Sequence, residues 1–284
     1  FLERLERQGL LLRRGSKSVP TGFGFLLFGK APREVLHHAG LNATVEYPDG
    51  THEIENFDGP TILIPAQVED WLRPKLPNVI DRSRMTRVER PALPFELVRE
   101  AVVNALVHRD YDLTGATCHL VVTADTVTVR SPGAPLLPVT VELMQDFTAP
   151  MYNRNPKLQF AFGGTKLVEG RGFGMRTFGE AAAKHGLPLP KYAFDGLYLN
   201  LTIYRHARAA VQALGTAVLE KLSKSERAGW EWISLRQQAT SSEYAEATKL
   251  PYRTAMNHLS KFQELGLLEK AGSARATQYK LRKP

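Results

Sequence analysis

Residues 97–108 read LVREAVVNALVH, and only four of these twelve side chains are polar. On a helix that turns about 100° per residue, Glu100, Asn104 and His108 fall at about 0°, 40° and 80°, which is one narrow stripe. Arg99 lies about 100° from Glu100, on the edge that we expect to meet water. Apolar residues fill most of the remaining circumference, so the pattern predicts a helix that is buried nearly all round.

A carboxyl group, an amide and an imidazole on a buried helix need polar partners, because burying them unpaired would cost roughly several kcal/mol in total. They either satisfy one another in a structural hydrogen-bond network or line a polar cavity that takes a ligand. The residue pattern leaves both alternatives open.

The spacing Glu-x-x-x-Asn-Ala-x-x-His from Glu100 to His108 resembles the N-box of the GHKL ATP-binding fold, the fold of gyrase, MutL and histidine kinases. The extended run EAVVNALVHRDY, residues 100–111, resembles one branch of that superfamily. This branch is the divergent ATP-binding domain of bacterial Schlafen/AlbA-type transcriptional regulators, which are related to RecG. The resemblance implies an α+β protein: a GHKL-like (Bergerat-type) α/β sandwich with an N-terminal α/β segment and a C-terminal winged helix-turn-helix.

The same resemblance implies roles for the polar stripe. Glu100 would orient or activate the attacking water as a general base, which a carboxylate can do. Asn104 would ligate the Mg²⁺ that bridges the phosphates, because a neutral amide oxygen suits this hard cation. We expect His108 to contact the same ligand. ATP and Mg²⁺ are therefore the expected cofactors, and a weak ATPase activity is left open.

Two glycine motifs follow in the order of the resembled fold. Gly170, Gly172 and Gly174 correspond to its second glycine box, the lid over the triphosphate, although a simple turn is the alternative. Glycines let backbone amides surround a phosphate, and the helix that follows adds positive potential at its N-terminus. Gly133, in the run Ser-Pro-Gly that starts at Ser131, matches the first glycine box. The Asp that binds adenine in most GHKL proteins is missing there, which puts adenine selectivity in doubt.

A third motif, Asn-Arg-Asn-Pro at residues 153–156, resembles the Arg-Asn-Pro motif of the branch and implies that Arg154 points toward the phosphates. The rival interpretation is a helix start, with Asn155 as the N-cap and Pro156 in the first turn. The run Gly-Gly-Thr-Lys at residues 163–166 is not a phosphate-binding P-loop, and no such loop occurs elsewhere in the sequence. A helicase motor is therefore not expected.

The C-terminal end is strongly basic. From Lys249 onward, eight lysine and arginine residues stand against two glutamates. Basic charge that is concentrated in one terminal module is typical of nucleic-acid binding, and a solvated basic face without a partner is the alternative.

The pattern of this end predicts a short helix from Ser241, a turn at residues 249–251, a second helix from about Tyr252 to Leu265, and a hairpin. This arrangement resembles a winged helix-turn-helix, whose second helix would enter a major groove and whose wing would meet phosphates. A winged helix used for protein contacts or dimerisation is the alternative. The expected core face is Ala255, Leu259, Phe262 and Leu265. The expected DNA contacts are Arg253, Thr254, Asn257, His258 and Lys261 on the helix, and Arg275 and Lys280 on the wing.

The other expected strands are short. They comprise residues 23–28, 43–47, 51–54 and 61–64, a hairpin over residues 116–123 and 126–130, and two strands within residues 192–204. Residues 22–32 are similar to the segment that joins the AlbA-like Schlafen domain to the ATP-binding domain in the resembled family. No internal repeat is evident. The expected domains are residues 1–90, 91–207 and 208–284.

The composition is that of a globular protein, with 43% hydrophobic and 23% charged residues in 284 and a net charge of +8. It excludes a largely disordered chain, a collagen-like repeat and a coiled-coil rod. No apolar run approaches the ~18 residues that a membrane span needs, so no membrane partner is expected. The single cysteine, Cys118, excludes an internal disulfide and fits a reducing, cytoplasmic setting. The chain opens at Phe1 without a methionine, and we expect further sequence upstream.

Together these patterns predict an ATP-binding, DNA-binding transcriptional regulator, expected as a homodimer on double-stranded DNA, whose nucleotide state alters dimerisation or the placement of the winged helices. One alternative is a non-enzymatic DNA-binding protein with a degenerate nucleotide site, which the missing adenine Asp favours. The other is an assembly module of a defence or RNA-processing system.

Overall fold

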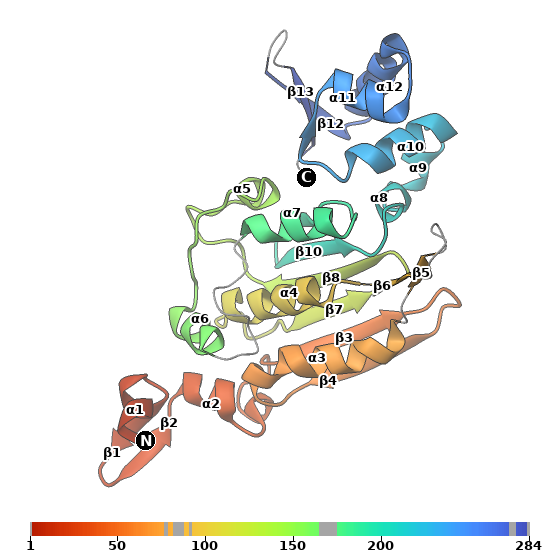
Figure 1. Cartoon of the computed structure of the whole chain (residues 1–284). Helices are drawn as coiled ribbons and strands as arrows, with labels where there is room; N and C mark the ends of the chain where they lie inside the picture. The colour runs from red at the N-terminus through yellow and green to blue at the C-terminus, as the bar shows by residue number, and fades with distance from the viewer. Residues whose placement is uncertain are drawn as a thin grey trace.

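The computed structural model describes residues 2–76, 79–81, 88–90, 93–164, 175–272 and 277–282. Figure 1 follows the chain from a small N-terminal projection, through a large layer of strands and helices, to a separate group of elements at the C-terminal end.

A six-stranded sheet forms the centre of the molecule, with the strand order β4-β3-β7-β8-β10-β9. Neighbouring strands are antiparallel except for β3 and β7, which run parallel with Leu41 opposite Cys118. The strands are β3 (Leu41–Glu46), β4 (His52–Phe57), β7 (Cys118–Val122), β8 (Thr126–Pro132), β9 (Lys191–Phe194) and β10 (Tyr198–Tyr204).

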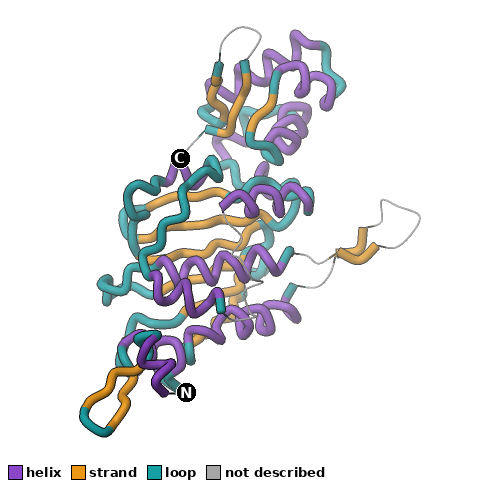
Figure 2. Tube along the Cα trace, turned by 60° about the vertical axis from the view of Figure 1, so that its left-hand side comes forward, coloured by secondary structure: helices purple, strands orange, loops and turns teal. Residues whose placement is uncertain are grey.

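Helices cover one face of this sheet. Figures 1 and 2 show α3 (Ile64–Leu72), α4 (Phe95–His108) and α7 (Met175–Lys184) lying side by side across the strands. Of the two shorter helices, α6 (Pro156–Gly163) contacts α4, and α5 (Val141–Gln145) contacts β9. The alternation of buried and half-buried residues along β7 and β8 gives the sheet its apolar inner face, and α4 packs on that face.

The helix α4 contains residues 97–108, the stretch whose pattern predicted a helix. It begins after Pro94, whose carbonyl accepts from the Leu97 amide at 3.0 Å, and it ends at His108, because Arg109 has extended backbone angles. Nine of its fourteen residues are buried, Glu100 among them. The prediction of a helix buried nearly all round is confirmed.

The sheet joins segments on both sides of residue 90, where the sequence predicts a domain boundary. Strand β3 pairs with β7, and one hydrophobic core extends from Leu26 to Ile203. Short elements complete this half of the chain: α2 (Gly22–Phe28), the 3-10 turns at Pro32–Glu34, Thr61–Leu63 and Arg73–Lys75, and the strands β5 (Val79–Asp81) and β6 (Val88–Arg90).

Two of the expected strands are wrong. Residues 23–28 form the helix α2, which Thr21 caps by accepting a hydrogen bond from the Gly24 amide at 3.1 Å. A side chain at position 24 would place its Cβ 2.0 Å from the Leu10 carbonyl oxygen, so the glycine permits this close packing. Residues 61–63 form a 3-10 turn, and Ile64 begins α3.

The C-terminal elements have a hydrophobic core of their own. It includes Trp230, Tyr244, Leu259 and Phe262, all buried. A three-stranded antiparallel sheet in the order β11-β13-β12 packs with the helices. The elements are α8 (Ala209–Gln212), α9 (Thr216–Leu219), α10 (Lys224–Ile233), β11 (Gln238–Ala239), α11 (Ser241–Thr248), α12 (Tyr252–Glu264), β12 (Leu268–Ala271) and β13 (Gln278–Leu281).

The N-terminal projection consists of α1 (Leu2–Arg7) and a two-stranded hairpin, β1 (Leu11–Arg14) and β2 (Lys17–Pro20). Among the described residues, none of the helices combines the length and the apolar character that crossing a bilayer requires.

Candidate functional site

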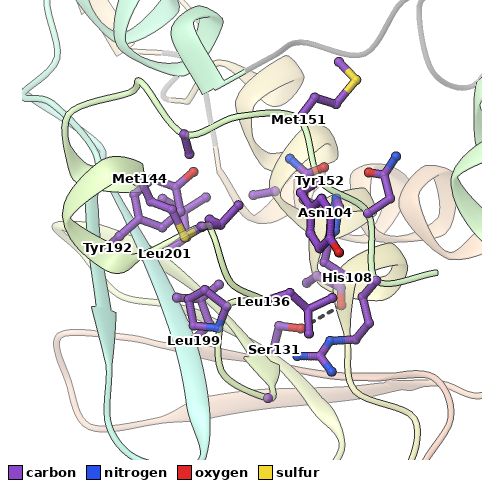
Figure 3. A pocket seen from close by; sticks show the side chains of 18 of the residues that line it. Asn104, His108, Ser131, Leu136, Met144, Met151, Tyr152, Tyr192, Leu199 and Leu201 are labelled. Atoms are coloured by element: carbon purple, nitrogen blue, oxygen red, sulfur yellow. Dashed lines mark hydrogen bonds between the residues drawn. The ribbon is translucent and has the colours of Figure 1, made fainter. Parts of the chain in front are cut away.

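The polar stripe of α4 lines a cavity between this helix, the sheet and the chain that follows β8. Glu100, Asn104 and His108 all line the cavity, which has a volume of about 520 Å³. Figure 3 shows Asn104 and His108 on one wall and Met144, Leu199 and Leu201 across from them. Pockets that bind small molecules and cofactors are typically about 300–1,000 Å³ in volume and mostly apolar, with a few placed polar groups.

Glu100 is the buried acid of this wall. Its residue is 7% exposed, and burial raises the pKa of its carboxyl group to about 7. The Asn104 amide donates to Glu100 Oε1 over 3.2 Å, which opposes that rise. Because this hydrogen bond uses the amide nitrogen, the amide oxygen of Asn104 remains available for another group. The stripe therefore partly satisfies itself through this hydrogen bond and also faces the cavity.

His108 lies one turn further along the same wall. Its pKa is lowered from the ordinary value, first by burial and then by the nearby positive charge of Arg154. The imidazole is therefore neutral at pH 7 and can both donate and accept a hydrogen bond.

The opposite wall is apolar. Its residues are Val129 of β8, Leu199 and Leu201 of β10, Met144 of α5, Phe147 just after α5, and Phe178 of α7. Tyr192 joins them from β9, and burial raises the pKa of its phenol, so that group stays protonated. A ligand with one flat apolar part and one charged part matches this division of the walls.

Gly133 closes the cavity where β8 ends. Its φ of +111° suits glycine, and a Cβ there would lie 2.7 Å from the Asp110 Cβ. Ser131 occupies the place of the expected adenine-binding acid, and its hydroxyl donates to the Ala105 carbonyl oxygen at 2.8 Å. The carboxylate missing from the sequence motif is thus replaced by a side chain that is held to α4 (Figure 3).

Arg154 lines the rim of the cavity and is held by two partners. It forms an ion pair with Asp110 at 2.9 Å and donates to the Ala134 carbonyl oxygen at 2.6 Å. Asn155 is the N-cap residue of α6 by position, with Pro156 in the first turn, but its side chain makes no capping hydrogen bond. It donates instead to two carbonyl oxygens at the end of α4, Val107 and Arg109, both at 2.8 Å.

Two residues near the cavity were missed by the sequence analysis. Arg109 is fully buried, and its guanidinium group donates to the carbonyl oxygens of His38, Leu113 and Ala116, so it fixes the turn that follows α4. Gln159 of α6 lines the cavity, and its buried Oε1 has no hydrogen-bond partner among the described residues. A lone glutamine in a short helix carries no sequence signal for such a role.

The predicted glycine loop at Gly170, Gly172 and Gly174 lies outside the described residues, so the structure does not place it. Helix α7 begins at Met175, directly after that loop. Within the described ranges, no group of three or more His, Cys, Asp or Glu side chains is arranged to hold a metal ion. A cation at Glu100 and Asn104 would therefore need ligands from a bound molecule.

The predicted DNA contacts are distributed unevenly over the C-terminal elements. Arg253 and Asn257 are exposed on α12, whereas Thr254 and Lys280 are half-buried. Lys261 forms an ion pair with Glu226 at 2.8 Å, and Arg275 lies outside the described residues.

The prediction for His258 is wrong. This residue is 7% exposed and does not lie on the outer face of α12. Its Nδ1 is 3.0 Å from the Tyr244 hydroxyl oxygen, inside the C-terminal core. The buried face of α12 therefore includes His258 as well as Ala255, Leu259 and Phe262.

Comparisons with known proteins agree with this geometry over part of the chain. Residues 115–203, which hold β7 to β10, match a family described as "Putative ATP-dependent DNA helicase recG C-terminal". The central part of the chain is similar to an ATPase-like domain. The match begins after α4 and covers less than half of the chain, and none of the curated proteins compared with the chain matches it.

The solved structure of the DIP2311 protein from Corynebacterium diphtheriae is similar over nearly the whole chain. The TM-score is 0.59 at 19% sequence identity, and the similarity covers 98% of this chain. It covers 57% of that protein, so the chain spans less than two thirds of its length. At this identity the likeness concerns the fold alone.

Proposed function

We propose that this chain binds ATP with Mg²⁺ in the cavity beside α4 and that it binds double-stranded DNA through its C-terminal elements, as a cytoplasmic transcriptional regulator. One observation carries the nucleotide part. An acid, an amide and an imidazole from one helix line a cavity of about 520 Å³ whose opposite wall is apolar and belongs to the ATPase-like region.

The two walls suit the two ends of a nucleotide. The apolar wall, with Leu199 and Leu201, offers a surface for a base, and the polar wall of α4 faces the phosphates. Gly133 lets the backbone approach the ligand closely, and Arg154 brings a positive charge to the rim. Gly170, Gly172 and Gly174 would contact the phosphates, an assignment that rests on the order of the motifs in the resembled fold.

The residues fit a magnesium ion that comes with the nucleotide. Magnesium is commonly held by one or two protein oxygens together with substrate phosphates and water. Asn104 offers its amide oxygen to the ion, because its amide nitrogen is already bonded to Glu100. When bound, the ion would neutralise phosphate charge. Glu100 would accept a proton from a water molecule, for which its pKa of about 7 is well matched.

Calorimetric titration with ATP and Mg²⁺ tests the nucleotide part directly. The Glu100→Ala variant is expected to bind ATP but to lose any turnover, whereas Glu96→Ala, on the same helix but paired with His185, should behave as the wild type. Hydrolysis by Glu100→Ala at the wild-type rate would show that Glu100 is not the base.

The DNA part of the proposal rests on the C-terminal elements. Two helices joined by a tight turn at Lys249, followed by a hairpin, form the arrangement of a winged helix, with α12 as the helix for the major groove. Arg253, Asn257 and Thr254 would meet the DNA, and Lys280 and Arg275 would meet phosphates from the wing. Two copies in a homodimer would read two half-sites.

A duplex-binding assay with Arg253→Ala/Asn257→Ala tests this part. Loss of affinity is expected for the double variant but not for Lys221→Ala/Lys224→Ala, which removes exposed charges from outside α12. Equal affinities of the two variants would contradict the proposal that α12 enters the groove.

A second candidate function is a DNA-binding protein whose nucleotide site is degenerate. Ser131 favours it, because it stands where most GHKL proteins carry the adenine-binding acid and its hydroxyl is engaged by Ala105. The absence of ATP binding in the titration, together with normal duplex binding, would favour this function. A third, an assembly module in defence or RNA processing, predicts tighter binding to RNA than to duplex DNA across a salt series.

A further inference from the structure

The backbone of the N-terminal projection, from α1 to β2, follows the same path as the end of α12 and the hairpin of β12 and β13. In both places a helix ends, a glycine follows in the left-handed region, and two antiparallel strands form a hairpin. The glycines are Gly9, with φ of +70°, and Gly266, with φ of +72°. A second pair of left-handed glycines, Gly15 and Gly272, stands where the first strand of each hairpin ends.

Three backbone hydrogen bonds of one segment have a counterpart in the other. At the helix ends, the Gly9 amide donates to Glu6 and the Gly266 amide to Gln263, both at 2.9 Å. The next amide of each segment donates to a carbonyl oxygen five residues back, over 2.9 Å for Leu10 and 2.8 Å for Leu267. The hairpins close in the same way, from Thr21 to Leu10 at 3.0 Å and from Arg282 to Leu267 at 2.9 Å.

The sequences agree at the positions that this geometry needs. With a constant offset from residues 2–16 to residues 259–273, the identical pairs are Leu2 and Leu259, Gly9 and Gly266, Leu10 and Leu267, Leu11 and Leu268, Gly15 and Gly272, and Ser16 and Ser273. Arg4 and Arg13 also correspond to the basic residues Lys261 and Lys270. The two segments therefore share sequence at these positions as well as a backbone path, and their hairpins differ in the length of their connections.

The tip of the N-terminal hairpin is strongly basic. Arg13, Arg14 and Lys17 are exposed, and no described residue forms an ion pair with any of them. Arg14 and Lys17 lie directly opposite each other in the strand register. Like charges in directly opposite positions destabilise a hairpin, and a bound anion would relieve that repulsion. The hairpin points away from the body of the protein (Figure 1).

We propose that the tip of this N-terminal hairpin is a second binding site for the phosphate backbone of double-stranded DNA, formed by Arg14 and Lys17 on one face of the hairpin and Arg13 on the other. The site shares its partner with the proposed function of the C-terminal module but rests on other residues. Hairpin wings contact DNA through basic side chains that meet phosphates, and this hairpin combines that form with three unpaired cations.

The two sites lie toward opposite ends of the molecule (Figure 1). Two linked contacts raise the effective affinity for one duplex when its length allows both to engage. We therefore expect the N-terminal site to matter more for long duplexes than for short ones.

The experiment compares four full-length proteins on a long and a short duplex across a salt series: the wild type, Arg13→Glu/Arg14→Glu/Lys17→Glu, Arg253→Ala/Asn257→Ala, and a control. The control, Lys30→Glu/Lys184→Glu/Lys191→Glu, makes the same change in net charge at exposed positions elsewhere. A neutral version of the hairpin variant carries glutamine at the three positions. Circular dichroism of every protein shows whether the substitutions cause a folding defect.

The hairpin variant is expected to lose at least about tenfold in affinity for the long duplex, and its salt slope should fall by about 2–3, because each lost phosphate contact removes about 0.9. The control should change much less. If the hairpin variant and the control behave alike while the α12 variant loses binding, the hairpin site is overturned and the proposed function stands. Preference of the wild type for RNA, or no duplex binding by it at all, also overturns the site.

Discussion

Glu100 shows how one buried side chain connects the sequence pattern to a measurable property. Its pKa of about 7 lies above the ordinary glutamate value of 4.5 because burial disfavours the charged form. The folded state therefore holds this proton more tightly than the unfolded state. The contribution of this group to stability is fully present below pH 4.5 and is lost as the pH rises to about 7.

The Glu100→Gln variant removes this titration. We expect it to match the wild type near pH 4.5 and to exceed it in free energy of unfolding by about 1–3 kcal/mol at pH 8. Urea denaturation at the two pH values measures the difference. Glu34→Gln, at an exposed position outside this helix, is the control and should show no such growth with pH. A constant difference between Glu100→Gln and the wild type at both pH values would contradict the raised pKa.

Asn104 tunes the same carboxyl group. Its hydrogen bond to Glu100 lowers the Glu100 pKa, so Asn104→Ala is expected to raise that pKa further and to shift the fall in stability toward higher pH. The midpoint of the pH dependence of stability measures this shift. A midpoint that moves downward would mean that the amide does not stabilise the charged carboxylate.

At the residue scale, the sequence predicted the polar stripe because helical periodicity places Glu100, Asn104 and His108 on one side whatever the fold around them. It could not predict that Arg109 is buried, since that burial is made tolerable by the carbonyl group of His38, 71 residues earlier, together with those of Leu113 and Ala116 after α4. His258 was misplaced for a similar reason: Tyr244, fourteen residues away, supplies its partner.

At the element scale, the end of β8 depends on one glycine. Gly133 has a positive φ and lies against Asp110, so alanine there would be strained and crowded. We expect Gly133→Ala to lower the free energy of unfolding by about 1–3 kcal/mol. Gly115→Ala, where a Cβ would meet nothing within 4 Å, should stay within about 0.5 kcal/mol of the wild type. Thermal denaturation of both variants tests this, and equal effects would contradict it.

Helices and strands were predicted correctly where the residues that determine them are close together in the sequence. The hairpin of β7 and β8 and the turn between β9 and β10 depend on neighbouring residues, and both were predicted. Helix α2 was missed because its run of phenylalanines and leucines is typical of a strand, whereas the Thr21 cap and the fit of Gly24 against Leu10 depend on the projection before it.

At the scale of the whole molecule, two separate hydrophobic cores stand out. One is built around the six-stranded sheet and the other around Trp230, Tyr244 and Phe262. Local sequence patterns could not predict that β3 pairs with β7, because that contact joins segments more than seventy residues apart.

Because the two cores are separate, a substitution that leaves a cavity in the smaller core should destabilise that core and not the larger one. Leu259 is fully buried there, and Leu259→Ala is expected to destabilise this core by about 2–5 kcal/mol. Hydrogen exchange should become faster in α10 to α12, while the amides of β7, β8 and β10 keep their protection. Uniformly faster exchange in both parts would show that they unfold as one unit.

The pairing of β3 with β7 also bears on how the ATPase-like region can be isolated. A fragment that starts just before α4 would lose the hairpin of β3 and β4, and β7 would become an edge strand with unpaired amides and carbonyls along its whole length. Exposed sheet edges of this kind pair with strands of other molecules. Any shortened protein meant to retain this cavity in a well-behaved form must keep residues 41–57, although they lie far from the cavity in sequence and supply none of its walls.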